Sequence, residues 1–193
     1  MEFLTKEPKQ IDYLMKVIIS GKDKTGKSIF DQRLGYNNID KQFFKSNYLQ
    51  YKETMGFEFI SIYIKFNNKN FKLQIWDTQG NELYIDIIKC FFHASSIVLL
   101  FYDAFDKQSF EYVKKIYSEQ KNLVKCLFYL IRIKYDLNIK PENKDFVSDE
   151  EALEYADKNN ILFLHLSSFE KYDNGINSLL NYVLKQYLLN NNN

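Results

Sequence analysis

Gly21-Lys22-Asp23-Lys24-Thr25-Gly26-Lys27-Ser28 is a complete G-x-x-x-x-G-K-S pattern, which is typical of a loop that holds a phosphate chain. The apolar run Tyr13–Ile19 before it predicts a buried strand, and residues 29–34 after it predict a short helix that stops at Gly35. In this context backbone N–H groups surround phosphate oxygens at a helix N-terminus, Lys27 reaches the outer phosphates and the Ser28 hydroxyl ligates Mg²⁺. A chance match is expected in only about one chain in a hundred of this size.

The length and composition are typical of one compact domain. A chain of 193 residues, 46% of them hydrophobic, can bury a sizeable core. The net charge of +1 gives no electrostatic reason to expect nucleic acid as a partner. Cys90 and Cys126 lie in apolar contexts, which favours free thiols in a reducing compartment over a disulfide. We therefore expect a cytoplasmic protein, and a monomer.

Strand and helix signals alternate along the chain, which indicates an α/β fold with a mostly parallel sheet. Two alternating segments flank the polar turn at residues 67–70 and predict a β-hairpin. Ser148 begins a capping box whose helix runs to about Asn159, and an apolar stripe marks a last helix over residues 176–188. The predicted strands beyond the first are residues 59–66, 71–75, 96–102, 127–131 and 161–166.

These segments predict a single domain over residues 13–189. Residues 1–12 form an N-terminal extension, and residues 190–193 form a disordered asparagine tail.

The stretch Trp76-Asp77-Thr78-Gln79-Gly80 supplies a second acidic element after an apolar strand. The Asp77 carboxylate can support Mg²⁺ directly or through water, and Gly80 lets a backbone N–H approach the terminal phosphate. An aspartate after a strand is by itself an ordinary strand end. Its order after the phosphate loop favours a role in metal binding.

Three segments give the chain a resemblance to the Ras superfamily of small GTPases, and most to its Rab branch. Lys72–Thr78 matches the Rab strand that leads into switch II, and Thr54–Phe59 resembles the Rab segment Thr-Ile-Gly-Val-Asp-Phe. Asp106–Phe110 resembles the Asp-x-x-Ser-Phe after the fourth Rab strand, and the similarity covers roughly Tyr13–Leu189. The resemblance implies a P-loop NTPase three-layer α/β sandwich with about six strands and five helices. It also implies a GTP- and GDP-binding, Mg²⁺-dependent molecular switch that acts in vesicle or intracellular transport.

The family motifs map onto individual positions of this chain. They imply that Ser28, Thr54 and Asp77 hold Mg²⁺, and that Asn81, Lys27 and Thr54 take part in hydrolysis. The nucleotide-binding positions implied by the match are Asp23, Lys24, Thr25, Gly26, Lys27, Ser28, Ile29, Thr54, Gly80, Lys134, Asp136, Ser168 and Phe169.

The same match implies two switch segments, Thr54–Phe59 and Asp77–Tyr84, which contact effector and regulatory proteins. Phe59, Trp76 and Phe91 fall where Rab proteins carry an aromatic triad that reports switch state to effectors. Packing between the two switches is an equally good interpretation of these three rings.

Guanine recognition departs from the family pattern, since the Rab Asn-Lys-x-Asp motif is here Ile133-Lys134-Tyr135-Asp136. Asp136 can still accept both guanine N–H groups, and Lys134 can still lie along the base. Ile133 lacks the polar bonds of asparagine, and each lost bond costs about 1–3 kcal/mol, roughly ten- to a hundredfold in affinity. Ser167-Ser168-Phe169 replaces Ser-Ala-Lys, where backbone contacts to the base could survive. We expect weakened guanine binding.

Two further departures concern hydrolysis. The family's water-orienting glutamine is here Asn81, whose amide is one carbon shorter. Asp23 stands where the family often has glycine, and its carboxylate would repel the γ-phosphate, although Lys22 and Lys24 offset part of that charge. Both changes together predict a slow GTPase. The alternative is a pseudo-GTPase interaction module that binds nucleotide weakly or without turnover.

The first switch carries an insertion over residues 37–48, in which Phe43 and Phe44 are candidates for a ring stacked on guanine. The same aromatic loop is also a candidate partner surface. Glu2 excludes N-terminal myristoylation, and the terminal residues 190–193 contain no cysteine to prenylate. We therefore expect no direct membrane anchor and membrane association only through partners.

Overall fold

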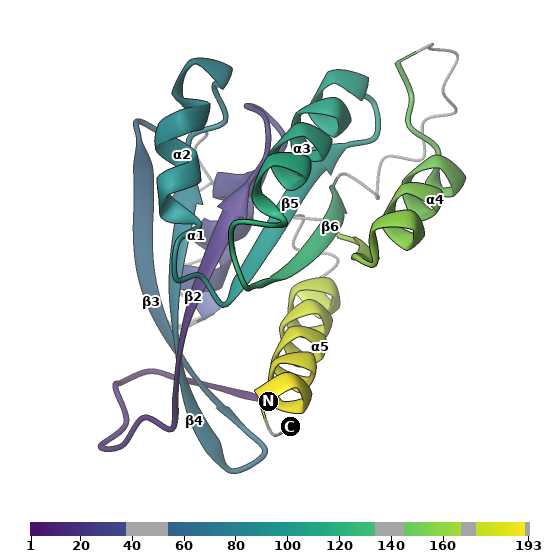
Figure 1. Ribbon diagram of the computed structural model, residues 1–193. Helices are drawn as coiled ribbons and strands as arrows, with labels where there is room; N and C mark the ends of the chain where they lie inside the picture. The colour runs from purple at the N-terminus through teal and green to yellow at the C-terminus, as the bar shows by residue number, and fades with distance from the viewer. Residues whose placement is uncertain (38–53, 134–144, 167–172, 192–193) are drawn as a thin grey trace.

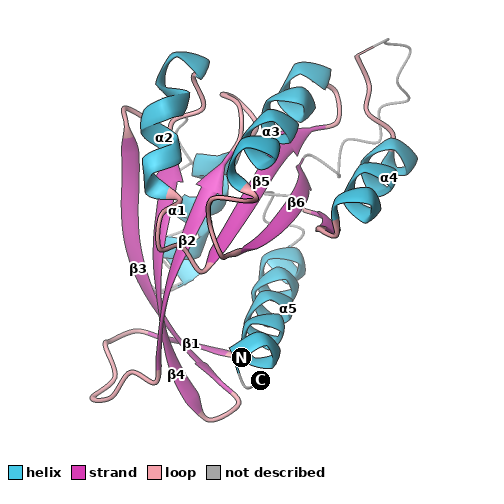
Figure 2. Ribbon diagram, viewed as in Figure 1, coloured by secondary structure: helices cyan, strands magenta, loops and turns pink. Residues whose placement is uncertain are grey.

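The computed structural model describes residues 1–37, 54–133, 145–166 and 173–191. Within them, seven strands form one sheet in the order β1-β3-β4-β2-β5-β6-β7 (Figure 2). The pairs of β1 with β3 and of β3 with β4 are antiparallel, and all other pairs are parallel. The strands are β1 (Glu2–Leu4), β2 (Tyr13–Ser20), β3 (Phe57–Phe66), β4 (Lys69–Thr78), β5 (Ile97–Asp103), β6 (Leu127–Ile133) and β7 (Leu162–His165).

Helices cover both faces of the sheet, which confirms the predicted three-layer α/β architecture (Figure 1). On one face, side chains of α1 and α5 pack into a core with β2, β4 and β5. On the other face, α2, α3 and α4 enclose a second core. Because β5 lies between these layers, all seven of its residues are buried, as its continuous apolar run predicts. The helices are α1 (Lys27–Asn37), α2 (Ile85–Phe91), α3 (Lys107–Gln120), α4 (Asp149–Asn159), α5 (Asp173–Asn191) and the short 3-10 helix η2 (Glu82–Tyr84).

Local sequence signals account for several of these boundaries. Asn67 and Asn68 adopt φ of 49° and 60°, so they form the tight, left-handed turn that joins β3 to β4. The Ser148 side chain accepts a hydrogen bond from the Glu151 N–H at 3.1 Å and begins α4. Asn160 ends the same helix in the left-handed conformation at φ 53°.

Three sequence expectations differ from the structure. The sheet has seven strands because Glu2–Leu4 pairs with β3, although these residues were expected to form an extension outside the domain. Helix α1 continues through Gly35 to Asn37, because Gly35 keeps a negative φ and so does not end the helix as a left-handed cap would. Helix α5 includes Asn190 and Asn191, which were expected in a disordered tail.

Within the described ranges, every helix is too short or too polar to cross a bilayer.

Candidate functional site

The phosphate-binding pattern forms the turn between β2 and α1, as predicted. Gly21 has φ 156°, and a Cβ there would collide with the main-chain oxygen of Phe101. Gly26 has φ 96° and faces the side chain of Ile133, whose Cγ2 would lie 3.3 Å from a Cβ at this position. Lys24 takes the left-handed region at φ 65°, a conformation that costs a non-glycine residue roughly 1–2 kcal/mol. The loop is therefore held in an unusual backbone shape by its neighbours.

Lys27 is the buried cation of the loop. Its side chain is 5% exposed, and its ammonium donates a hydrogen bond to the Lys22 carbonyl at 2.9 Å. Burial lowers the pKa of Lys27, while the carboxylates of Asp77 and Asp23 act in the opposite direction. A desolvated ammonium at a helix N-terminus interacts strongly with anions.

Three oxygen-bearing side chains from separate parts of the chain converge beside this lysine. The Ser28 hydroxyl donates to Asp77 Oδ2 at 2.6 Å and lies 3.0 Å from the Thr54 hydroxyl. The Thr54 hydroxyl in turn lies 3.4 Å from Asp77 Oδ2. Ser28 is the second residue of α1, Thr54 precedes β3 and Asp77 lies near the end of β4. The structure thus brings together the three residues expected to hold Mg²⁺.

The chemistry of this set fits a magnesium ion. Asp77 is fully buried, and its second oxygen, Oδ1, has no hydrogen-bond partner among the described residues. Burial raises the pKa of Asp77, although Lys27 and Ser28 favour its ionised form. Hydroxyl and carboxylate oxygens are the hard ligands that Mg²⁺ prefers, and it commonly uses few protein ligands together with phosphate oxygens.

Asp31 is a second buried acid that sequence reasoning did not single out. It lies one helical turn after Lys27 and is 2% exposed. Burial, and then the nearby carboxylates of Asp77 and Glu58, raise its pKa to about 8. Its position four residues after a buried lysine was a usable signal, because that spacing places both side chains on the same side of a helix.

Switch II lies directly on the phosphate loop. The Asp23 N–H donates to the Gly80 carbonyl at 3.3 Å, and a Cβ at Gly80 would collide with the backbone of Lys22 and Asp23. The Asn81 side chain caps η2 by accepting a hydrogen bond from the Leu83 N–H at 3.0 Å. The Asn81 amide oxygen is therefore bonded within its own turn.

The two switch segments are joined at Gly56. Its N–H donates to the side-chain oxygen of Gln79 at 3.0 Å, and its carbonyl accepts from the Gln79 N–H at 3.0 Å. The sequence placed Gln79 in the second switch segment but did not predict this contact, because its partner is main chain 23 residues away. This contact lies two residues from Thr54 and two from Asp77.

The Lys22 ammonium contacts two side chains at the start of α3. It donates to Gln108 Oε1 at 2.6 Å and lies 3.5 Å from Asp106 Oδ2. The sequence expectation that Lys22 offsets the Asp23 charge is therefore weakened, because Lys22 already pairs with Asp106.

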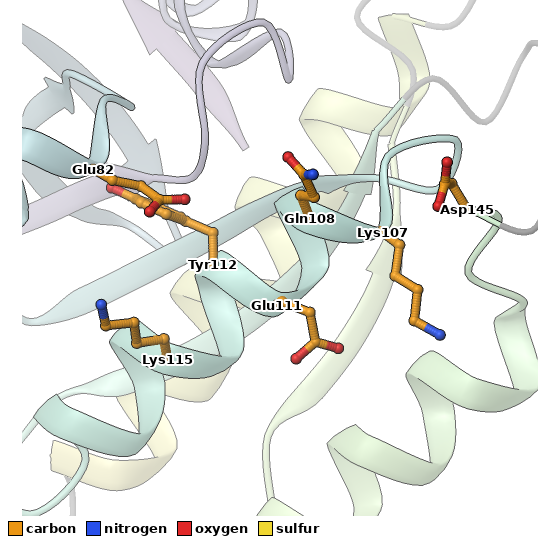
Figure 3. A pocket seen from close by; sticks show the side chains of 7 residues that line it. All are labelled: Glu82, Lys107, Gln108, Glu111, Tyr112, Lys115 and Asp145. Carbon is orange, nitrogen blue, oxygen red and sulfur yellow. The ribbon is translucent and has the colours of Figure 1, made fainter.

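A cleft of about 450 Å³ lies between η2 and α3, next to Gln108 (Figure 3). The Tyr112 side chain extends towards Glu82 across the end of this cleft (Figure 3). Cationic and anionic side chains are mixed along it, so the cleft favours no single charge of ligand. The lining residues are Glu82, Lys107, Gln108, Glu111, Tyr112, Lys115 and Asp145.

Of the segment Ile133–Asp136, which the family match assigns to guanine recognition, the described residues include only Ile133. This side chain is 2% exposed and belongs to the same buried apolar cluster as Leu166, which is 3% exposed. Arg132 pairs with His165 at the end of β7, so Ile133 and Leu166 are the residues that follow this pair along the chain. Lys134, Asp136, Ser168, Phe169 and the insertion with Phe43 and Phe44 lie outside the described residues.

The three rings of the predicted aromatic triad lie in one cluster, and a fourth ring, Phe57, packs against two of them. The Trp76 centroid lies 4.9 Å from that of Phe59 and 5.6 Å from that of Phe91. Phe57 joins them at 5.0 Å from Trp76 and 4.9 Å from Phe91. Phe57 and Phe59 are 45% and 44% exposed, so these rings both pack together and face solvent.

Phe57 and Phe59 belong to a larger set of exposed apolar side chains on the two switch segments and the adjoining helix α2. We call this set the switch face. It consists of Met55, Phe57, Phe59, Leu83, Tyr84 and Ile87.

Comparison with known proteins agrees with this architecture. A sequence profile of the Ras family matches residues 16–188. The chain is 31% identical to Ras-related protein Rab11A of Lotus japonicus, over 83% of this chain and 67% of that protein. It is 34% identical to Ras-related protein Rab-4 of Dictyostelium discoideum, over 81% of this chain and 71% of that protein. It is 29% identical to Ras-related protein RABA4c of Arabidopsis thaliana, over 88% of this chain and 71% of that protein. With the phosphate loop, the switch segments and the three-layer fold, these matches establish that the chain belongs to the Ras family as a Rab-like small GTPase.

Proposed function

We propose that this protein is a guanine-nucleotide switch that binds GTP and GDP with Mg²⁺, hydrolyses GTP slowly and acts in vesicle transport. The observation that carries the proposal is the convergence of Ser28, Thr54 and Asp77 beside the buried ammonium of Lys27. These groups come from α1, from the segment before β3 and from β4, and their meeting at a phosphate-binding turn has no simpler explanation in packing.

Each group has a distinct role in this proposal. Lys27 neutralises the outer phosphates, and the N–H groups of the loop bind phosphate oxygens at the start of α1. Ser28, Thr54 and Asp77 would hold Mg²⁺, which would neutralise negative charge on the outer phosphates. Gly80 keeps a main-chain group close to the loop where a larger residue would collide. Thr54 belongs to the first switch segment and Gly80 to the second, so contacts with a third phosphate would hold both segments in place.

Slow hydrolysis follows from the second switch. The hydrogen bond from the Leu83 N–H occupies one lone pair of the Asn81 amide oxygen and fixes the orientation of the side chain, which limits how the amide can orient an attacking water. Asp23 places a carboxylate at the same edge of the loop, while Lys22 is paired with Asp106 rather than with Asp23. Both features support a low intrinsic rate.

Partner binding is assigned to the switch face. Met55 is 88% exposed and Leu83 is 87% exposed, and the rings of Phe57 and Phe59 are about half exposed. An apolar surface carried by segments that sense the nucleotide suits effector and regulatory proteins.

The binding test begins with the nucleotide released when the purified protein is denatured, identified by chromatography. We expect GDP or GTP. Calorimetry should then show Mg²⁺-dependent binding of both in preference to ATP, strongly weakened in Lys27→Ala and little changed in Lys6→Ala, an exposed lysine outside the loop. Equal affinity for ATP, or binding that is indifferent to Lys27→Ala, would overturn the proposal.

The hydrolysis test uses single turnover of bound GTP. The rate of the wild type is expected at or below the roughly 10⁻⁴ s⁻¹ scale of an unassisted small GTPase. The double variant Asp23→Gly, Asn81→Gln should be clearly faster. A wild-type rate on the order of 10⁻² s⁻¹ would contradict slow hydrolysis, since it would require another group that orients water.

A second candidate is a pseudo-GTPase that serves as an interaction module. The observation that favours it is the apolar packing of Ile133, at a position where the family has asparagine. This candidate predicts weak nucleotide binding and no turnover, even in the double variant.

A further inference from the structure

Tyr112 of α3 is a buried tyrosine whose hydroxyl has no partner among the described residues. The residue is 3% exposed, and its hydroxyl oxygen is closed off from solvent. A buried hydroxyl without a hydrogen bond destabilises a protein, because water would otherwise bind it. A partner that reaches this hydroxyl in another state of the protein would recover that free energy.

Two carboxylates lie near the Tyr112 hydroxyl. The side chain extends towards Glu82 of η2, at the end of the cleft between η2 and α3 (Figure 3). Burial raises the pKa of Tyr112, and the negative charges of Asp23 and Glu82 act in the same direction. A neutral phenol donates one hydrogen bond, and an ionised carboxylate accepts it. Asp23 belongs to the phosphate loop and Glu82 to the second switch segment, so the hydroxyl faces both moving parts of the site.

The Asp23 side chain lies between the phosphate loop and the second switch segment. Its Oδ1 is 2.6 Å from the point where a Cβ at Gly80 would lie, and its N–H donates to the Gly80 carbonyl at 3.3 Å. Lys22, which precedes it, pairs instead with Asp106 and Gln108 at the start of α3. The cation next to Asp23 in the chain is therefore already engaged by another carboxylate.

The side of α3 that carries Tyr112 is joined to the phosphate site by described contacts. Gln108 and Tyr112 are four residues apart, a spacing that places their side chains on the same side of a helix. Gln108 accepts a hydrogen bond from the Lys22 ammonium, and the Lys22 carbonyl accepts one from the buried ammonium of Lys27. Tyr112 thus lies one helical turn from a chain of bonds that ends at the phosphate-binding lysine.

We propose that Tyr112 is a positioning residue for Asp23, whose carboxylate accepts a hydrogen bond from the Tyr112 hydroxyl when a third phosphate occupies the loop. The inference rests on the proposed function, because it concerns the site that holds the γ-phosphate. A γ-phosphate repels the Asp23 carboxylate and favours a side chain turned away from it. Donation from Tyr112 stabilises the carboxylate in that orientation, since hydrogen bonds to a charged acceptor are strong. GDP exerts no such repulsion, so GDP binding does not require the bond.

The experiment compares Tyr112→Phe with the wild type in calorimetry with Mg²⁺, using GDP and a non-hydrolysable GTP analogue. Phenylalanine keeps the buried ring and removes only the hydroxyl. We expect affinity for the analogue to fall about tenfold and GDP affinity to stay nearly unchanged. Tyr129→Phe is the matched control. Tyr129 is 1% exposed and its hydroxyl also has no partner among the described residues, but it lies in the core on the other face of the sheet. It should leave both affinities unchanged.

A second comparison assigns the effect to Asp23. Without this carboxylate the hydroxyl has no acceptor to hold, so adding Tyr112→Phe to Asp23→Gly should change neither affinity. Urea unfolding without nucleotide gives an independent readout. Tyr112→Phe should be at least as stable as the wild type, because the hydroxyl it removes is unpaired in this structure.

Three outcomes would overturn the inference: unchanged affinity of Tyr112→Phe for the analogue, equal losses for GDP and the analogue, or the same loss in the Asp23→Gly background. A Tyr112→Phe protein that is less stable than the wild type would also count against it, since the hydroxyl would then already have a structural role. Failure of the wild type to bind GDP at all would refute the proposed function instead.

Discussion

Asp31 is a carboxyl group enclosed by the core, one turn into the helix that follows the phosphate loop. Its Oδ1 has no hydrogen-bond partner among the described residues, and the carboxylates of Asp77 and Glu58 act on it with the same sign. A buried carboxyl in such surroundings prefers to be neutral. The residue therefore makes the stability of the site depend on pH.

The pKa of Asp31 is about 8 in the folded protein, against 3.8 for the ordinary group. Because the folded pKa is the higher one, the folded protein binds more protons between these values, and its stability falls as pH rises from about 4 to about 8. We expect the free energy of unfolding of Asp31→Asn to rise relative to that of the wild type as the pH increases from about 4 to about 8. Urea unfolding in EDTA, without nucleotide, measures this difference. At about 1.4 kcal/mol per pKa unit the gain should reach several kcal/mol near pH 8.

Asp157→Asn is the control for this experiment, because Asp157 is exposed on α4. It should leave the pH profile of the wild type unchanged. A constant difference between Asp31→Asn and the wild type at all pH values would contradict the interpretation.

Ile133 illustrates how neighbours decide the effect of a substitution. Asparagine alone would place an amide beside Leu166 and Gly26, where a buried polar group without a partner costs about 1–3 kcal/mol. We expect Ile133→Asn alone to lose stability and to regain little GDP affinity. Adding Leu166→Thr supplies a hydroxyl partner for the new amide. The double variant should therefore bind GDP at least about tenfold more tightly than Ile133→Asn does.

The wild type, both single variants and the double variant form a double-mutant cycle. Calorimetry measures their GDP affinities, and urea unfolding measures their free energies of unfolding. Additive effects of the two substitutions would mean that residues 133 and 166 do not interact.

At the scale of elements, the ends of helices and strands carry the site. Asp106 caps α3 by accepting from the N–H groups of Gln108 and Ser109, and the same side chain pairs with Lys22 of the phosphate loop. Gln79 follows β4 and bonds to Gly56 just before β3. Each such contact couples the position of one element to that of another.

The contact between Gln79 and Gly56 should favour nucleotides with a third phosphate. It holds the chain close to Thr54, which in the proposed function contacts Mg²⁺ and the γ-phosphate. Gln79→Ala should weaken binding of a non-hydrolysable GTP analogue by about three- to tenfold and leave GDP affinity nearly unchanged. Calorimetry with Mg²⁺ measures both values.

Gln74→Ala is the comparison variant, since Gln74 is a half-buried glutamine on β4, the strand that precedes Gln79. An equal loss for GDP and the analogue in Gln79→Ala would assign Gln79 a purely structural role.

For the whole molecule, the N-terminal strand belongs to the sheet and not to an appendage. β1 pairs with residues 63–65 of β3, and Phe3 packs against the core formed with α1 and α5. Two strands, β3 and β4, separate it from β2 and the phosphate loop. Its contribution should therefore be to stability and not to nucleotide binding.

Phe3→Ala should lower the free energy of unfolding by about 1–3 kcal/mol, because a half-buried ring leaves the core. Urea unfolding measures the loss, and Thr5→Ala, an exposed position beside β1, should change little. GDP affinity should stay at the wild-type value. A Phe3→Ala protein as stable as the wild type would show that β1 contributes nothing to the core.

The residues of the phosphate loop, the hairpin, the buried strands and the cap of α4 could be predicted from the sequence. Each depends on a local pattern: glycines and a lysine at fixed spacing, alternation with a period of two, or a serine before a helix. The meeting of Ser28, Thr54 and Asp77 was implied by the resemblance of their segments to small-GTPase motifs, and the structure brings the three side chains together.

Only the tertiary structure revealed the seventh strand, the continuation of α1 past Gly35, the contact between Gln79 and Gly56, and the neighbours of Asp31 and Ile133. The sequence by itself determined which chemical groups the chain brings to a phosphate site. Tertiary packing decided which partner each group meets, because those partners lie tens of residues away. Burial, hydrogen bonding and pKa depend on such distant neighbours, and no spacing within a local motif encodes them.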